Sequence, residues 1–360
     1  MSIDAKKTTY TKSFYKDNFK FIIETEDESI FEDIQRFISF ESIAKSNVIY
    51  DVTKIYIKDK KDLDDKVKKI AEEGKKIVIH GGTPEQHVFG KKTETETENI
   101  YRIPLNDEYI IQRTQDNSYY LYGNNNGKED NLYRVIREIY YRKSLALGRV
   151  ALHSAAVSDS KGNCILIPGE KAAGKTTLLC NFLSSDKYNF IDNDRLLLEI
   201  GSREKVLAHS MSSTVNVGYG TMSICPDKFK KIMIAGYMTP TDKKRYSRNE
   251  FIEQMRCSAN TSGTVKSILF PSIAKEKKVS MRKCDESEKM ERISSAIEKF
   301  DNSEHPDWLG ISNISEEQYK ANIEKILQVI ERKIPANEIE FGYEKINSKT
   351  IEDIKDIGER

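Results

Sequence analysis

The sequence predicts an α/β protein in which a phosphate-loop core follows an N-terminal α+β module. Residues 169–176, with the sequence GEKAAGKT, fit the pattern G-x-x-x-x-G-K-[ST] at every fixed position. The apolar residues 164–167 before them are typical of a buried strand, and residues 176–183 after them are typical of the start of a helix. Strand, loop and helix therefore follow one another in the order that the motif requires.

The N-terminal module is expected to span residues 1–127. Runs rich in β-branched and aromatic residues predict its strands, and the spacing of Leu63, Val67 and Ile70 before Gly74 predicts a helix. Residues 91–99, with their Thr-Glu repeats, predict an exposed loop, and residues 123–127 predict the domain boundary. The strands are expected at residues 19–25, 48–57, 76–80, 101–105, 108–112 and 118–122.

The second domain is expected to span residues 128–360. It begins with an amphipathic helix, because apolar side chains recur at helical spacing from Leu132 to Tyr140 before Gly148. Residues 243–248 form a basic cluster, which predicts a solvated loop or a contact to phosphate or to an acidic substrate. Further strands are expected at 152–157, 205–208, 214–217, 267–270, 277–283 and 338–341, and further helices at 286–300, 316–332 and 350–357.

The chemistry of the phosphate loop follows from its backbone. Gly169 and Gly174 allow the dihedral angles that turn successive N–H groups inward, and the helix that begins near Lys175 adds its positive end. Lys175 would reach the outer phosphates, and the Thr176 hydroxyl would be a magnesium ligand. The cofactors expected are therefore ATP and Mg2+. The expected nucleotide-binding residues are Gly169, Glu170, Lys171, Ala172, Ala173, Gly174, Lys175, Thr176 and Thr177.

Two features beside the loop indicate which kind of phosphate-loop protein this chain resembles. His153 lies on the strand that leads into the loop, and Asp192 and Asp194 follow about one helix later, between two apolar runs. Together with the loop, this arrangement resembles the catalytic core of HPr kinase and of the HPr-kinase-like proteins found with peptide-modification systems. The resemblance is strong over residues 153–194 and loose over residues 132–342.

The resemblance implies a phosphate-loop core of the HPr kinase type and a kinase activity. Such a kinase would transfer the γ-phosphoryl group of ATP to a hydroxyl group, with a Ser or Thr of a peptide or protein as the favoured acceptor. Asp194 or Asp192 would be the catalytic base, with His153 and Lys175 as the other catalytic residues. Asp194 would join Thr176 as a metal ligand.

Two positions depart from the family pattern. Asn193 and Asp194 stand where the family usually has two adjacent aspartates, and Ala172 stands where the loop usually has a glycine. A small-molecule kinase and a nucleotide-binding regulatory protein without transfer activity therefore stay open, and Asn193 favours the latter. A phosphate-loop hydrolase is disfavoured, because residues 190–194 are the one stretch in which an apolar strand ends in Asp.

Composition bounds the partners and the location. The chain has 58 Lys and Arg against 57 Asp and Glu, a net charge of +1, which argues against a nucleic-acid binder that works by bulk charge. No apolar run approaches membrane-spanning length and the first residues show no targeting signal, which predicts a cytoplasmic protein with no membrane partner. The 5 cysteines are far apart, so we expect them to be reduced and not to hold zinc. The expected partners are a nucleoside triphosphate and a peptide or protein substrate, and a homo-oligomer is left open.

Overall fold

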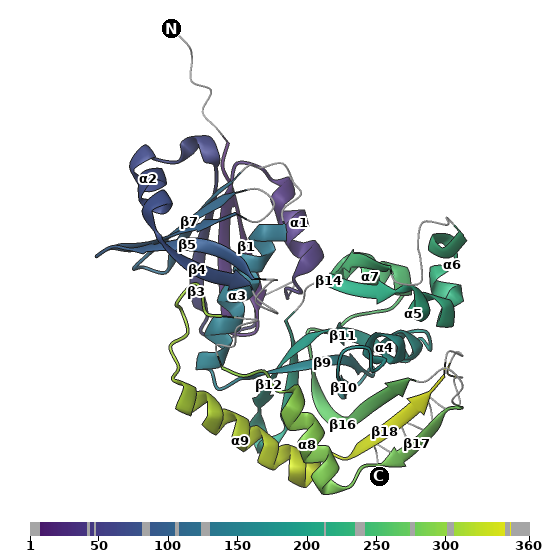
Figure 1. The fold of residues 1–360 in the computed structure, drawn as a ribbon. Coiled ribbons are helices and arrows are strands. Elements are labelled where there is room, and N and C mark those ends of the chain that lie inside the picture. Colours follow the sequence, from purple (N-terminus) through teal and green to yellow (C-terminus); the bar gives the residue numbers. More distant parts are fainter. Residues whose placement is uncertain are drawn as a thin grey trace. The chain divides into compact units, whose positions relative to one another are not determined.

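The computed structural model describes residues 8–41, 44–46, 48–80, 87–104, 108–123, 130–211, 214–234, 242–273, 278–300, 306–342 and 346. The chain divides into two compact units: unit 1 comprises Met1–Arg142 and Asp301–Ser312, and unit 2 comprises Lys143–Phe300 and Asn313–Arg360. Helices and strands are mixed in the chain, so the predicted α/β class is confirmed (Figure 1). The domain boundary expected at residues 127 and 128, and the helix expected at 350–357, lie outside the described residues.

Unit 1 is built on a sheet of eight described strands in the order β1-β2-β3-β8-β7-β6-β5-β4. β3 lies parallel to both of its neighbours, β2 and β8, and the other pairs are antiparallel. The strands are β1 (Tyr10–Lys16), β2 (Phe19–Thr25), β3 (Asp51–Asp59), β4 (Lys75–His80), β5 (Val88–Glu94), β6 (Glu98–Ile103), β7 (Tyr109–Thr114) and β8 (Ser118–Gly123).

The strands and helices of unit 1 are held together by buried apolar side chains. Along β2, Phe19, Phe21 and Ile23 are buried and the residues between them are partly exposed, as expected for a strand with one face in the core. The helices are α1 (Ser29–Phe37), α2 (Asp65–Glu73) and α3 (Asp130–Ala146), with the short 3-10 helix η1 (Lys60–Asp62). Phe37 of α1 stacks on Tyr133 of α3 with ring centroids 4.4 Å apart, and Ala71 of α2 packs with Ile100 and Ile110 of the sheet.

A segment distant in sequence completes unit 1. The Trp308 ring lies edge-on to Tyr101 at a centroid distance of 5.8 Å, and the Tyr101 hydroxyl donates to the Leu309 carbonyl oxygen at 2.6 Å. The Arg113 guanidinium donates to the Gly310 carbonyl oxygen at 3.1 Å. These contacts differ from the expected division, which assigned all of residues 128–360 to the second domain.

The prediction of an exposed loop at residues 91–99 is wrong. Lys91 to Glu94 belong to β5 and pair with Asn99 to Arg102 of β6, so that only the residues between Glu94 and Glu98 form the turn. The polar composition hid a hairpin whose side chains are mostly partly exposed. Strand β1 and helix α1 were not predicted either.

The main sheet of unit 2 contains a ring of five strands. β10 pairs with β9, β9 with β12, β12 with β13, β13 with β16, and β16 closes the ring on β10. β18 and β17 extend the sheet beyond the second half of β16, and β11 pairs with β9. These strands are β9 (Val150–Ser158), β10 (Asn163–Pro168), β11 (Asn189–Asp192), β12 (Arg195–Ile200), β13 (Val206–Ser210), β16 (Ser262–Ile273), β17 (Ser280–Lys283) and β18 (Ala336–Phe341).

Helices lie on both sides of this sheet, with α4 on one side and α8 and α9 on the other (Figure 1). The antiparallel pair β14 (Thr214–Gly218) and β15 (Lys243–Ser247) adds a second small sheet. The basic cluster expected as a loop is therefore strand β15 up to Ser247, and Arg248 begins α7. The helices are α4 (Lys175–Leu183), α5 (Tyr219–Ile224), α6 (Pro226–Ile234), α7 (Arg248–Met255), α8 (Glu286–Ala296) and α9 (Glu316–Lys333), with the 3-10 helix η3 (Ser202–Glu204).

Within the described ranges, no helix is both long enough and apolar enough to cross a lipid bilayer.

The five cysteines are free thiols. Burial raises the pKa of four of these thiols, which disfavours their reactive thiolate forms; the four are Cys164, Cys180, Cys257 and Cys284.

Candidate functional site

The phosphate loop runs from the end of β10 at Pro168 to the start of α4 at Lys175. Gly174 has a φ of 102°, outside the range that residues with a side chain normally adopt. A Cβ atom there would also lie 2.9 Å from Cζ of Phe341 and 3.2 Å from Cβ of Ile273. Both the backbone and the packing therefore require the glycine that the motif fixes.

Ala172 marks a strained point in the same loop. Its φ of 69° lies in the left-handed region, where a residue with a Cβ atom costs about 1–2 kcal/mol. This is the position at which the resembled family usually carries a glycine. The structure thus gives a physical reason for glycine here, and this chain keeps the conformation at the expense of strain.

The Lys175 amine donates hydrogen bonds to the backbone of its own loop. It donates to the carbonyl oxygens of Gly169 at 2.6 Å and Glu170 at 3.0 Å. Burial lowers the pKa of Lys175, Lys243 lowers it further, and the nearby Asp194 and Glu170 carboxylates oppose these effects. Lys175 and Lys243 thus repel each other, and an anionic ligand bound near both amines would relieve this repulsion.

Three successive residues at the end of β11 have three different partners. Asp192 is buried, and its carboxylate accepts from the Ser210 hydroxyl at 3.0 Å and from the Asn193 backbone N–H at 2.8 Å. The side-chain oxygen of Asn193 accepts from the Thr176 hydroxyl at 3.1 Å. Asp194 lies beside His153, and its side chain is 62% exposed.

His153 lies beside Asp194, on β9, the strand that precedes β10 and the loop. Its Nδ1 atom is 3.6 Å from Oδ1 of Asp194. Burial lowers the pKa of His153, and Lys175 and Arg195 lower it further, whereas Asp194 raises it. Since the net shift takes the pKa below the ordinary value of 6.5, the imidazole is mostly neutral at neutral pH.

A cavity of about 430 Å³, called the phosphate-loop cavity below, is lined by Lys175, Thr176, Asn193 and Asp194, whereas His153 and Asp192 do not line it. Its floor is formed by loop residues together with Thr176, Asn193 and Asp194. Its roof comes from β14, α5 and β15 and includes Asn216, Tyr219, Thr221 and Lys243.

The sequence did not assign this roof to the site. Lys243 pairs with Gly218 and Arg245 with Asn216 across β14 and β15, so these four residues lie on one face of the small sheet. The Thr177 and Thr221 hydroxyl oxygens, 2.8 Å apart, connect α4 to the roof. The basic cluster was the one signal in the sequence that pointed here.

The oxygen atoms near the loop suit a magnesium ion. The Thr176 hydroxyl, the Asn193 amide oxygen and the Asp194 carboxylate are hard oxygen donors, the type that Mg2+ prefers. Among the described residues, no group of three or more His, Cys, Asp and Glu side chains could hold a metal by itself. Mg2+ fits this arrangement, because it is usually held by one or two protein oxygens together with substrate phosphates and water.

Comparison of the sequence with protein-family models gave no match, and a search of curated proteins gave none. The function must therefore be argued from the geometry of this cavity and from the motif that forms its floor.

Proposed function

We propose that this protein is an ATP-dependent kinase with a phosphate-loop core of the HPr kinase type, acting on a Ser or Thr hydroxyl of a peptide or protein. One observation carries the proposal. The phosphate loop and the exposed carboxylate of Asp194 line the same cavity, so that the phosphates of a nucleotide and a catalytic base would share one space. Lys243 adds a second cation to the lining of this cavity.

The loop would bind the triphosphate through its backbone N–H groups and the end of α4. The Lys175 amine would leave the carbonyl oxygens of Gly169 and Glu170 and donate its hydrogen bonds to phosphate oxygens instead. The new hydrogen bonds would be stronger, because the phosphate oxygens are negatively charged. Thr176 and Asn193, whose side chains contact each other, would hold Mg2+, which when bound neutralises charge on the phosphates. The Asp194 carboxylate would then remain available to the acceptor.

Asp194 would act on the acceptor. The acceptor hydroxyl gives its proton to the carboxylate as its oxygen forms a bond to the γ-phosphorus, and the bond from that phosphorus to the β,γ-bridging oxygen breaks to release ADP. His153, neutral and beside the carboxylate, would orient it. Asp192 would act indirectly, because its hydrogen bonds to Ser210 and to the Asn193 N–H fix the turn that carries Asp194.

A nucleotide-binding regulator without transfer activity is the alternative that a particular residue favours. Asn193 replaces one carboxylate of the resembled acid pair, and this lowers the negative charge available to a metal. A small-molecule hydroxyl is the other acceptor that the same cavity could serve.

The test is intact-mass analysis of the peptides and proteins encoded beside this gene, each incubated with the purified protein, ATP and Mg2+. A kinase gives a phosphate-sized gain, and Asp194→Asn lowers its rate by about 10²–10⁴-fold while ATP binding persists. Asp186→Asn is the matched control, because Asp186 lies after α4 with a side chain 80% exposed. ATP binding with no gain on any peptide or protein would refute the proposal as stated, and small-molecule hydroxyls would then be assayed in the same way.

A further inference from the structure

Unit 2 contains a second cavity, of about 730 Å³, at a notch in its main sheet. β13 pairs with β16 at Ser262–Thr264 and β18 pairs with β16 from Ile268 onward, both on the edge opposite β10. Residues 265–267 of β16 have no strand partner on that edge among the described residues. The cavity, called the basic cavity below, lies where the two strands separate.

A β-bulge places one cation in this notch. β10 and β16 pair Cys164 with Val265 and then Ile165 with Ser267, so that Lys266 is the extra residue of the bulge. Bulges re-aim the side chain that they insert and occur often beside binding sites. Lys266 is exposed and lines the basic cavity.

The other walls are also basic. The lining has seven Lys and Arg residues against three Glu residues, although the whole chain carries a net charge of only +1. Lys289 is fully engaged, since its amine donates to three backbone carbonyl oxygens at the end of α9 and pairs with Glu286 at 2.6 Å. Arg332 and Lys333 both pair with Glu204.

The remaining cations are Arg203, Lys205, Lys266 and Lys283. None of their side chains has an ion-pair partner within the part of the chain that the structure describes. They come from separate elements, namely the η3 turn, the residue before β13, the bulge and the end of β17. Like charges around one cavity repel each other, so a multivalent anion among them would be stabilised by all four.

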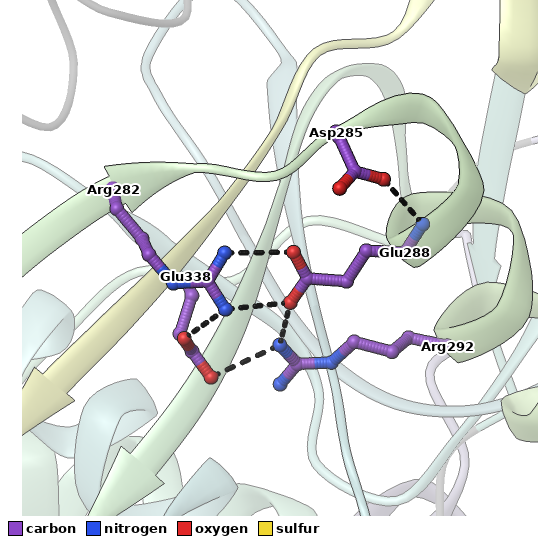
Figure 2. A network of polar contacts seen from close by, with 5 residues as sticks. All are labelled: Arg282, Asp285, Glu288, Arg292 and Glu338. Atoms are coloured by element: carbon purple, nitrogen blue, oxygen red, sulfur yellow. Dashed lines mark hydrogen bonds and ion pairs between the residues drawn. The ribbon is translucent and has the colours of Figure 1, made fainter.

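The wall that carries Lys283 is held in place by an ion-pair network, which Figure 2 shows from close by. The Arg282 guanidinium, next to Lys283 on β17, makes two contacts of 2.7 Å to the Glu288 carboxylate of α8 and one of 2.5 Å to Glu338 of β18. Arg292 contacts the same two carboxylates at 3.1 Å and 3.0 Å. β17, α8 and β18 are thereby joined to one another, and this fixes the backbone from which the Lys283 side chain extends.

From the bulge, the unpaired cations and the fixed wall, we propose that the basic cavity binds a small molecule that carries two or more phosphate groups. Its volume lies within the range of small-molecule sites. An ion with a single charge would leave most of the cations unneutralised. The proposal does not depend on the kinase activity, because the basic cavity and the phosphate-loop cavity have no lining residue in common.

The test uses tripolyphosphate as the probe and isothermal titration calorimetry of the full chain at about 0.15 M salt. The phosphate loop would bind the same probe, so the measurement is made on Lys175→Ala, which weakens that site. We expect saturable binding of one tripolyphosphate, weakened by about tenfold or more in Lys266→Gln and again in Lys283→Gln.

Lys230→Gln and Lys325→Gln are matched controls. Both lysines are exposed on helices, on α6 and α9, and neither lines the basic cavity. Thermal melting checks that each variant is folded. The proposal is overturned if Lys175→Ala does not bind tripolyphosphate, or if the control substitutions weaken binding as much as those in the cavity. Neither result bears on phosphoryl transfer, which is measured with Lys175 intact.

Discussion

Gly174→Ala provides the sharpest test of the phosphate-loop structure, because two separable costs are combined at this residue. The φ of 102° costs a residue with a Cβ atom about 1–3 kcal/mol. The new Cβ would lie 2.9 Å from the buried ring of Phe341 and 3.2 Å from the branched Cβ of Ile273, and such overpacking costs about 1–3 kcal/mol. The smaller entropy of the unfolded alanine chain offsets about 0.4–1 kcal/mol. The expected net loss is therefore about 3 kcal/mol.

Gly162→Ala separates the two costs. Gly162 has a φ of 78°, but a Cβ atom there would have no heavy atom within 4 Å. We therefore expect it to show only the backbone cost, about 1 kcal/mol after the entropy offset. Ala172→Gly is the reverse change, because it relieves a left-handed alanine that costs about 1–2 kcal/mol and adds about 0.4–1 kcal/mol of entropy to the unfolded chain. It should therefore raise the free energy of unfolding by about 1 kcal/mol.

The assay is urea unfolding followed by circular dichroism, with thermal melting as a second measure. For a unit of this size, a loss of about 3 kcal/mol lowers Tm by roughly 6–12 °C. The reasoning is refuted if Gly174→Ala and Gly162→Ala are equally stable, because the contacts with Phe341 and Ile273 would then cost nothing.

Three further predictions concern unit 2. Lys289→Met should lower the free energy of unfolding by about 2–4 kcal/mol, because it leaves three carbonyl oxygens at the end of α9 without their buried donor; urea unfolding measures this, with Lys325→Met as control. Hydrogen bonds from Arg282 lower the pKa of Glu288 to about 2. The stability that the Glu288 carboxylate adds is therefore present above pH 4.5 and lost as the pH falls toward 2. Glu288→Gln should flatten the dependence of urea unfolding on pH over this range. In an NMR titration, His153 should have a pKa below 6.5, lowered further by Asp194→Asn and raised by Lys175→Ala.

Local patterns predicted the elements that depend on neighbours in sequence. The burial pattern of β2 follows its alternating sequence, and the bounds predicted for it match the structure. Helix α2 lies where apolar spacing and Gly74 placed it. The hairpin of β5 and β6 was missed because Thr and Glu resemble loop composition, although their backbones pair. The docking of Trp308 on Tyr101 depends on a contact across about 200 residues, which no local pattern encodes.

The part of the candidate site formed by one continuous stretch of sequence was also predictable, whereas the part brought in by strand pairing was not. Its floor is one continuous motif whose glycine and lysine positions are fixed by backbone geometry, so the sequence located it. Its roof is brought in by the pairing of β14 with β15 and by the contact of Thr177 with Thr221. Lys243 appeared only as part of a charged run, because its place in the cavity depends on strand register.

The turn at residues 192–194 bears on the choice between a kinase and a regulator. The register of β11 against β9 shifts between Phe190 and Asp192, and the three residues that follow it have separate partners. Asn193 takes the role of accepting from the Thr176 hydroxyl, which an amide oxygen fills as well as a carboxylate. Asp194 keeps the position in the phosphate-loop cavity from which a base would act. The departure from the pattern of the resembled family therefore leaves the candidate base, Asp194, in the phosphate-loop cavity, and this supports the kinase proposal over the regulatory one.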